Sequence, residues 1–331
     1  MRPTMRPTVR RIFLALSLAA ASGTSVLSSA TVAADWPQRP VHIIVPYPAG
    51  GSTDLVTRLI AQRLSQSLGQ QVLVENRPGG ATMIGTGAAA RAVPDGYTLL
   101  ATANVFAVNV LLSKTPSYQV SDFTPIAAMA GYSYVLVVNP SLPVRTVTEL
   151  IAYAKQQPGK LNAASLGAGG VTHLLTARFE ALAGVPITTI DYKGSAPAMT
   201  DLLGGQVQMY FDTLITSMPN LRADRLRALA VSTPERSDLL PAVPSFRELG
   251  LSGMTQRGWL GLFAPVGTAT AVIDRLNRDV RAAVQTEDLR TRYLADGMFE
   301  LPFTPQEFAS FIKDDLKPWA STLRELNLKL D

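Results

Sequence analysis

The chain contains no cysteine among its 331 residues. This absence excludes disulfide bonds and a lipoprotein anchor, so burial of a hydrophobic core must supply the stability. The chain has only two histidines, His42 and His173, and their separation argues against a zinc site. It also lacks a G-x-S-x-G nucleophile elbow and a G-x-x-x-x-G-K-[ST] phosphate loop. We therefore expect no cofactor, no metal and no catalytic residue.

Long apolar runs are scarce, and the one near the N-terminus is typical of a secretory signal. Residues 12–21 form an apolar core that is too short to span a bilayer. The basic residues before and at its start are Arg2, Arg6, Arg10 and Arg11. Small residues at 32–34 favour cleavage after Ala34. We expect residues 1–34 to be a signal peptide and the mature protein to be periplasmic; Sec and twin-arginine export both stay open.

The positive charge of the chain lies mainly in this leader. The formal net charge is +5, and subtracting the four leader arginines leaves +1 for residues 35–331. That balance predicts no nucleic-acid or anionic-membrane partner. Residues 35–331 are long enough for two domains of ordinary size.

The stretch 41–68 organises the first part of the chain. Residues 41–46 are almost all apolar without alternation, which predicts a strand buried on both faces. A loop containing Gly50 and Gly51 follows, and apolar residues then recur at i+4 spacing to Leu68, as in a helix. Ser52, Thr53 and Asp54 are each suitable N-caps. A glycine loop before a helix start is either an anion site or a plain strand-to-helix connection.

Strand-like and helix-like segments alternate over the rest of the chain. The strands are expected at 71–75, 97–102, 134–139, 161–166, 187–191, 207–211, 226–232 and 259–264. Capping boxes at 146–149 and 304–307 predict two helix starts. A second glycine loop, 167–170, precedes a helix expected at 171–183. Repeated strand–helix units predict a mainly parallel α/β architecture.

Three further features have a structural and a functional interpretation. His173, in the first turn after the second glycine loop, is either a packed or capping residue or one that faces a ligand. Asp212 follows an apolar strand and is either an N-cap or a ligand group. The letters from Gly85 to Ala90 match a dinucleotide fingerprint, but the segment looks helical itself, which argues against that function.

Two glycine loops on facing domains would hold an anion from both sides, as in a periplasmic binding protein that closes about a hinge. The apolar segments 135–139 and 259–265 are the candidate crossovers. We accordingly predict a discontinuous first domain, residues 35–136 plus 259–331, and a second domain of residues 137–258.

A series of short motifs resembles the Bug-type, TctC-like solute receptors of tripartite tricarboxylate transporters. The motifs are Pro48–Asp54, Glu75–Gly80, Pro94–Leu99, Asn139–Pro143, Tyr192–Pro197, Asp201–Gln206, Phe211–Asp212, Trp259–Gly267 and Thr304–Phe308. They occur in order over essentially all of residues 35–331. The resemblance implies a two-domain type II periplasmic-binding-protein fold, with mainly parallel sheets flanked by helices and a carboxylate in the interdomain cleft.

The resemblance also implies the positions that meet the ligand. In the first domain they are Ala49, Gly50, Gly51, Ser52, Thr53, Asp54 and Thr102. In the second they are Ser165, Gly167, Ala168, Gly169, Gly170, His173 and Asp212. In amino-acid-binding members the residue at Asp212 meets the ligand amine. Family members often carry Asn and Ser or Thr where this chain has Ala168 and Gly170, which favours a ligand without an amine.

We predict a monomeric extracytoplasmic receptor that captures a dicarboxylate, tricarboxylate or aromatic acid for a membrane permease. One alternative is a periplasmic sensor that signals to a membrane partner. A second alternative is an exported hydrolase, although no nucleophile–base pair supports it.

Overall fold

The first strand and helix form where the apolar pattern predicts them. In the computed structural model, which describes residues 36–325, β1 covers Val41–Val45 and α1 covers Ser52–Leu68. Four of the five β1 residues are buried, as expected for a strand covered on both faces. The signal-peptide prediction, including cleavage after Ala34, lies outside the described residues.

The strands form one sheet in the order β2-β1-β3-β9-β4-β7-β5-β6, with β8 and β10 also paired to β4. The remaining strands are β2 (Val72–Asn76), β3 (Thr98–Ala103), β4 (Phe123–Val138), β5 (Asn162–Ser165), β6 (Thr188–Asp191), β7 (Met209–Thr213), β8 (Arg227–Val231), β9 (Arg257–Pro265) and β10 (Met298–Phe299). Neighbours within β2-β1-β3 and within β7-β5-β6 are parallel. These strand–helix repeats confirm the expected α/β class.

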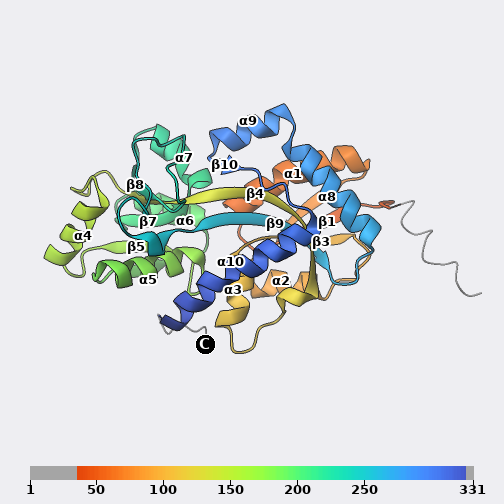
Figure 1. Cartoon of the computed structure of the whole chain (residues 1–331), viewed down its shortest axis with the longest axis horizontal. Helices are drawn as coiled ribbons and strands as arrows, with labels where there is room; N and C mark the ends of the chain where they lie inside the picture. The colour runs from red at the N-terminus through yellow and green to blue at the C-terminus, as the bar shows by residue number, and fades with distance from the viewer. Residues whose placement is uncertain (1–35, 326–331) are drawn as a thin grey trace, which may run out of the picture. The chain divides into compact units, whose positions relative to one another are not determined.

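Two long strands, β4 and β9, run together through the middle of the sheet (Figure 1). They pair antiparallel with each other and with β3 and β7. The predicted strand 134–139 is only the end of β4, which has 16 residues. Its first part was missed because alanines at 127, 128 and 130 and Gly131 have weak strand propensity. Burial on both faces sustains the strand there.

The helices follow the expected starts with two corrections. Their bounds are α2 (Met83–Ala90), α3 (Val105–Leu112), α4 (Val147–Gln156), α5 (Val171–Ala183), α6 (Ser195–Leu203), α7 (Leu214–Arg222), α8 (Thr270–Val284), α9 (Glu287–Ala295) and α10 (Pro305–Glu325). The box at Thr304 and Glu307 forms in full. In the box at Thr146, Glu149 accepts from Arg145 N–H rather than from Thr146. The N-cap of α1 is Gly51, not one of the polar residues after it.

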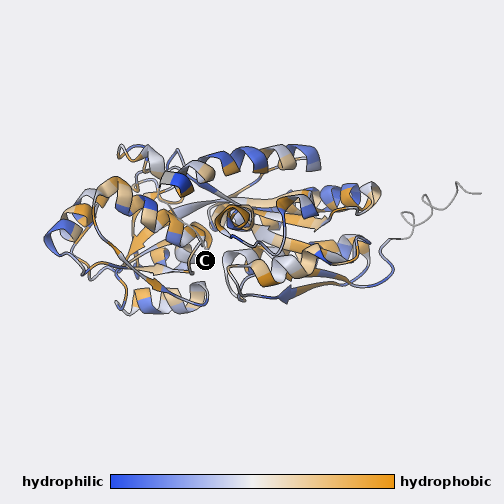
Figure 2. Cartoon of the chain, turned by 90° about the horizontal axis from the view of Figure 1, so that it is seen from below, coloured by the Kyte–Doolittle hydropathy of each residue, from blue (hydrophilic) through white to orange (hydrophobic). Residues whose placement is uncertain are grey.

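Helices cover the sheet, and the buried side chains include two separate hydrophobic clusters. One is aromatic and includes Phe106, Trp259, Phe263 and Phe308; the other includes Val135, Val137, Leu202 and Tyr210. Figure 2 shows apolar residues along the strands and polar residues along the outer helix faces. Of the described residues, 39–325 belong to one compact unit. The two-domain division within residues 39–331 stays a prediction.

Within residues 36–325 no helix has the length and apolar character to cross a membrane.

Candidate functional site

The first glycine loop has the backbone conformation that a close approach to a ligand requires. Gly50 has a φ of +83°, which favours glycine, and Gly51 is extended with a φ of −80°. No side chain caps the start of α1. The first-turn N–H groups of α1 therefore point out of the helix without a side-chain acceptor from the N-cap residue.

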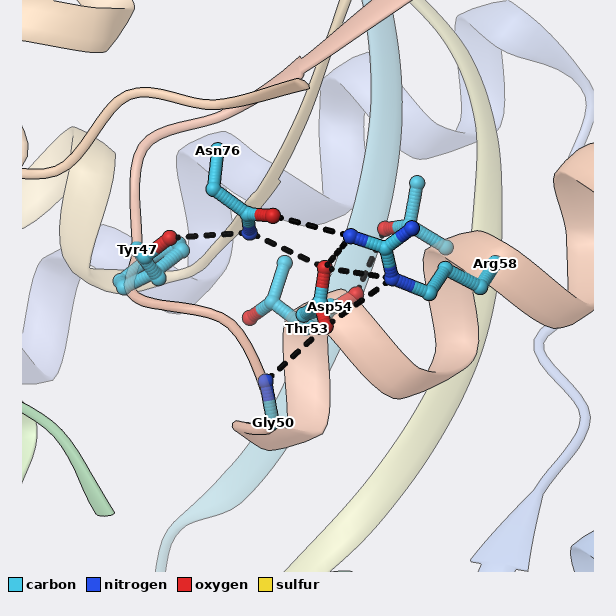
Figure 3. A network of polar contacts seen from close by, with 7 residues as sticks. Tyr47, Gly50, Thr53, Asp54, Arg58 and Asn76 are labelled. Atoms are coloured by element: carbon cyan, nitrogen blue, oxygen red, sulfur yellow. Dashed lines mark hydrogen bonds and ion pairs between the residues drawn. The ribbon is translucent and has the colours of Figure 1, made fainter. Parts of the chain in front are cut away.

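Asp54 holds this loop together (Figure 3). Its side chain is buried, and one carboxylate oxygen accepts the N–H of Gly50 at 2.9 Å. Arg58 and Asn76 also donate to the carboxylate, at 3.0 Å each for the shortest contacts. Burial raises the pKa of Asp54, but these donors outweigh it and hold the pKa below its ordinary value. Asp54 therefore acts on the loop, and the N–H of Gly50 is already bonded.

Asn76 links the hydrogen bonds around Asp54 to Tyr47, at the start of the first loop. Its amide donates to the backbone carbonyl of Tyr47 at 3.1 Å as well as to Asp54, and its oxygen accepts from Arg58 at 2.9 Å. The amide thus joins the end of β2 to both ends of the first loop (Figure 3).

Replacing Asp54 by alanine should lower the free energy of unfolding by about 1–3 kcal/mol, because Gly50 and Asn76 lose their hydrogen bonds to a buried carboxylate. Urea unfolding followed by tryptophan fluorescence measures this loss. Arg58→Gln is the control: its side chain is half exposed, and loss of its ion pair should cost less than about 1 kcal/mol. Equal losses in both variants would assign the stabilisation to the ion pair instead.

A chain of tyrosines lies behind the loop; Tyr132 and Tyr134 are buried and Tyr47 is half-buried. The hydroxyl of Tyr47 bonds to Thr102 at 3.2 Å and accepts the N–H of Ala103 at 3.3 Å. The hydroxyls of Tyr132 and Tyr134 are 3.0 Å apart, and Tyr134 donates to Asn104 at 3.3 Å. Burial raises the pKa of Tyr47 to about 12 and that of Tyr134 well above its ordinary value. These hydroxyls therefore stay neutral at physiological pH and can serve as hydrogen-bond donors.

Some buried polar groups near this chain lack partners. Asn104 is the N-cap of α3 and 1% exposed, yet its amide nitrogen has no hydrogen-bond partner among the described residues. The hydroxyl of Tyr210 faces Ser195, but no hydrogen bond of ordinary geometry joins them. An unpaired buried donor costs free energy that a ligand acceptor could recover.

The segment that meets the first loop is the start of α6. A methyl group placed on Gly194 would lie 3.1 Å from Cγ of Pro48, and one placed on Gly51 would lie 3.9 Å from Oγ of Ser195. Gly194 is the N-cap of α6 and supplies no side-chain cap. The N-termini of α1 and α6 are thus close together, and neither has a side-chain cap. Two helix N-termini form a combined region of positive potential.

The second glycine loop is bonded largely within itself. Leu166 and Gly167 donate their N–H groups to Thr172 and Ser165, at 2.9 and 3.1 Å, and Gly170 donates to the carbonyl of Gly167. Ser165 and Thr172 therefore hold the loop, while Ala168 and Gly169 form its tip. Nδ1 of His173 is buried without a hydrogen-bond partner among the described residues. No contact described for this loop joins it to the first loop, so its part in the site stays a prediction.

Asp212 lies at the end of β7 and is buried. Its carboxylate accepts from the hydroxyls of Thr216 at 2.6 Å and Ser217 at 2.8 Å, both on α7. Burial raises the pKa of Asp212 to about 6, although these hydroxyls pull it down. The N-cap of α7 is the next residue, Thr213, so Asp212 does not itself cap the helix. The structure thus supplies polar partners for Asp212 from the chain itself.

Comparison with known proteins identifies the family of this chain. Residues 56–328 match the family model described as the tripartite tricarboxylate transporter family receptor. The chain belongs to that receptor family. The expected family and fold are therefore confirmed.

Relatives match the receptor over nearly its whole length. BugT of Bordetella pertussis is 40% identical over 306 residues, which cover 91% of this chain and 94% of BugT. The structure of the periplasmic binding protein BugD matches with a TM-score of 0.85 and 32% identity, covering 89% of this chain and 99% of BugD. Rpa4515 of R. palustris, solved with adipate, matches with a TM-score of 0.85 and 35% identity, covering 89% and 99%.

The receptor places further residues around the first loop that were not among the expected site residues: Tyr47, Asn104, Gly194, Ser195 and Tyr210. Two signals could have indicated part of this set. An aromatic residue between Pro46 and Pro48 is unusual in a loop, and Asn104 directly follows a buried strand. The approach of Gly194 to Pro48 has no such local signal.

Proposed function

We propose that the receptor captures a small carboxylate in the periplasm and delivers it to the permease subunits of a tripartite transporter, without covalent chemistry. The observation that carries this proposal is the approach of two helix N-termini without side-chain caps, α1 and α6. A carboxylate between them would be stabilised by both helix dipoles and by backbone N–H groups. Adipate in Rpa4515, a relative of the same fold, supports this ligand class.

Neutral donors complete the proposed site. The amide of Asn104 lacks a partner, and Tyr210 presents its hydroxyl beside Ser195. Both are buried, so a hydrogen bond to a carboxylate would form in a low-dielectric environment where it is strong. We propose that residues 35–136 plus 259–331 form one domain and residues 137–258 the other, and that the two close on the ligand. The Pro48–Gly194 contact supports such a closed arrangement.

We further propose that the ligand has no amine. Asp212, the residue that would meet one, is already bonded to Thr216 and Ser217. A buried carboxylate awaiting an ammonium group would be expected to have a free face and few donors of its own.

Carboxylates should stabilise the receptor against heat, whereas the matching amides should not. A ligand at 100 times its dissociation constant adds about 2.7 kcal/mol to the free energy of unfolding. For a chain of this length that corresponds to a rise in Tm of roughly a few degrees. A thermal-shift screen with adipate and adipamide, benzoate and benzamide, and a set of other di- and tricarboxylates measures it. Equal shifts from acid and amide would contradict an anion site at helix N-termini.

A further inference from the structure

A cavity of about 220 Å³ opens directly beside the first loop. Gly50 and Ser195, which lie at the proposed carboxylate site, form part of its wall. The cavity extends away from them between α1, α6 and α7, up to Met298 of β10. It is therefore continuous with the place where the two helix N-termini approach each other.

The walls of this cavity are mainly apolar. Leu59 of α1, Met199 of α6, Ile215 of α7 and Met298 contribute to the lining. Methionine side chains are flexible and polarisable, so they adapt to ligands of different shape. An apolar protein cavity of about 150 Å³ is large enough for benzene. This one can therefore hold an aromatic ring or several methylene groups.

Three polar side chains of the cavity wall, Thr216, Arg292 and Asp296, already have hydrogen-bond partners. The guanidinium of Arg292 donates to Asp296 at 2.5 Å, and the hydroxyl of Thr216 donates to Asp212. A ligand group that entered would find few new hydrogen bonds. A second carboxylate would meet the acidic side chain of Asp296, which already engages the guanidinium of Arg292.

We propose that this cavity is an apolar subsite that receives the hydrocarbon part of the ligand, whose carboxylate lies at the N-termini of α1 and α6. This inference rests on the proposed function and narrows its ligand class. The receptor then prefers a monocarboxylate with an aromatic ring or a medium-length aliphatic chain. Compact polycarboxylates fill the carboxylate site but leave the subsite empty.

Isothermal titration of the receptor with butanoate, hexanoate and octanoate, and with benzoate, tests the subsite. Each methylene group buried in the cavity should tighten binding about fourfold, from about 0.8 kcal/mol per CH₂. Hexanoate should therefore bind on the order of 15-fold more tightly than butanoate. Benzoate should also bind more tightly than butanoate.

Two tryptophan variants test whether the gain in affinity with chain length arises in this cavity. Leu59→Trp fills the cavity from a partly exposed position on α1, so it should remove the gain in affinity with chain length. Leu294→Trp makes the same change at a residue of α9 that is 67% exposed and outside the cavity lining, and it should behave as wild type. Circular dichroism confirms that both variants are folded.

The outcomes separate the subsite from the proposed function. If butanoate binds and affinity does not change with chain length, the subsite is wrong while carboxylate binding stands. Equal loss of the chain-length effect in Leu59→Trp and Leu294→Trp also overturns the subsite. If no carboxylate binds the wild-type receptor, the proposed function itself fails, and the subsite with it.

Discussion

Replacing Asp212 by asparagine should raise the free energy of unfolding at pH 7.5 by up to about 3 kcal/mol. Burial raises the pKa of this carboxyl from 3.8 to about 6, and each unit corresponds to about 1.4 kcal/mol. The ionised form is thus destabilising in the folded receptor. Asparagine has a similar shape, and its oxygen can still accept from Thr216 and Ser217.

The pH dependence follows from the direction of the shift. Between about pH 4 and pH 6 the folded state holds a proton on Asp212 that the unfolded state has released. The contribution of this group to stability therefore falls as pH rises through that range and stays low above it. The Asp212→Asn variant should lack this decline, so the two proteins should differ little at pH 4 and most at pH 7.5.

Urea unfolding of both proteins at pH 4.0 and 7.5, followed by tryptophan fluorescence, measures the difference. Asp212→Ala is the control for lost contacts: it leaves the hydroxyls of Thr216 and Ser217 without their acceptor and should destabilise at both pH values. An Asp212→Asn variant that is less stable than wild type at pH 7.5 would show that the ionised carboxylate stabilises the fold.

Gly51→Pro should weaken carboxylate binding by about a hundredfold while leaving the fold intact. The φ of Gly51 is −80°, which proline can adopt, so the loop itself should not be strained. The substitution removes one backbone N–H from the first loop, and a hydrogen bond to a charged acceptor contributes about 1.5–3 kcal/mol. The ring would also face the space between Pro48 and Ser195.

Calorimetric titration with the carboxylate that gives the largest thermal shift measures this loss. Ser52→Ala is the matched control, because it removes a side chain and keeps the backbone N–H of the next position. It should change affinity only mildly, since no side chain caps α1. Loss of binding in Ser52→Ala with normal binding in Gly51→Pro would place the chemistry in the serine hydroxyl and revive the hydrolase alternative.

Several features of this receptor could be predicted because they depend on near neighbours in the chain. The nearly all-apolar strand β1, the helix α5 and the capping box at Thr304 all formed where expected. Asp54 was also expected beside the first loop, where the first turn of α1 holds it, and its part in ligand binding stays a prediction. Its carboxylate accepts the N–H of Gly50 in the loop beside it. The same carboxylate is held by Arg58, one helical turn away, and by Asn76, at the end of the adjacent strand.

Local pattern by itself determined the α/β class, the glycine loop before α1 and the ordered motifs that indicate the receptor family. Tertiary structure alone decided which loops meet. Gly194 reaches Pro48, and Tyr134 reaches Asn104, because β4 and β9 are long enough to connect both halves of the sheet. Such contacts join residues far apart in the chain, and their geometry depends on strand length, pairing and twist rather than on the residues beside them.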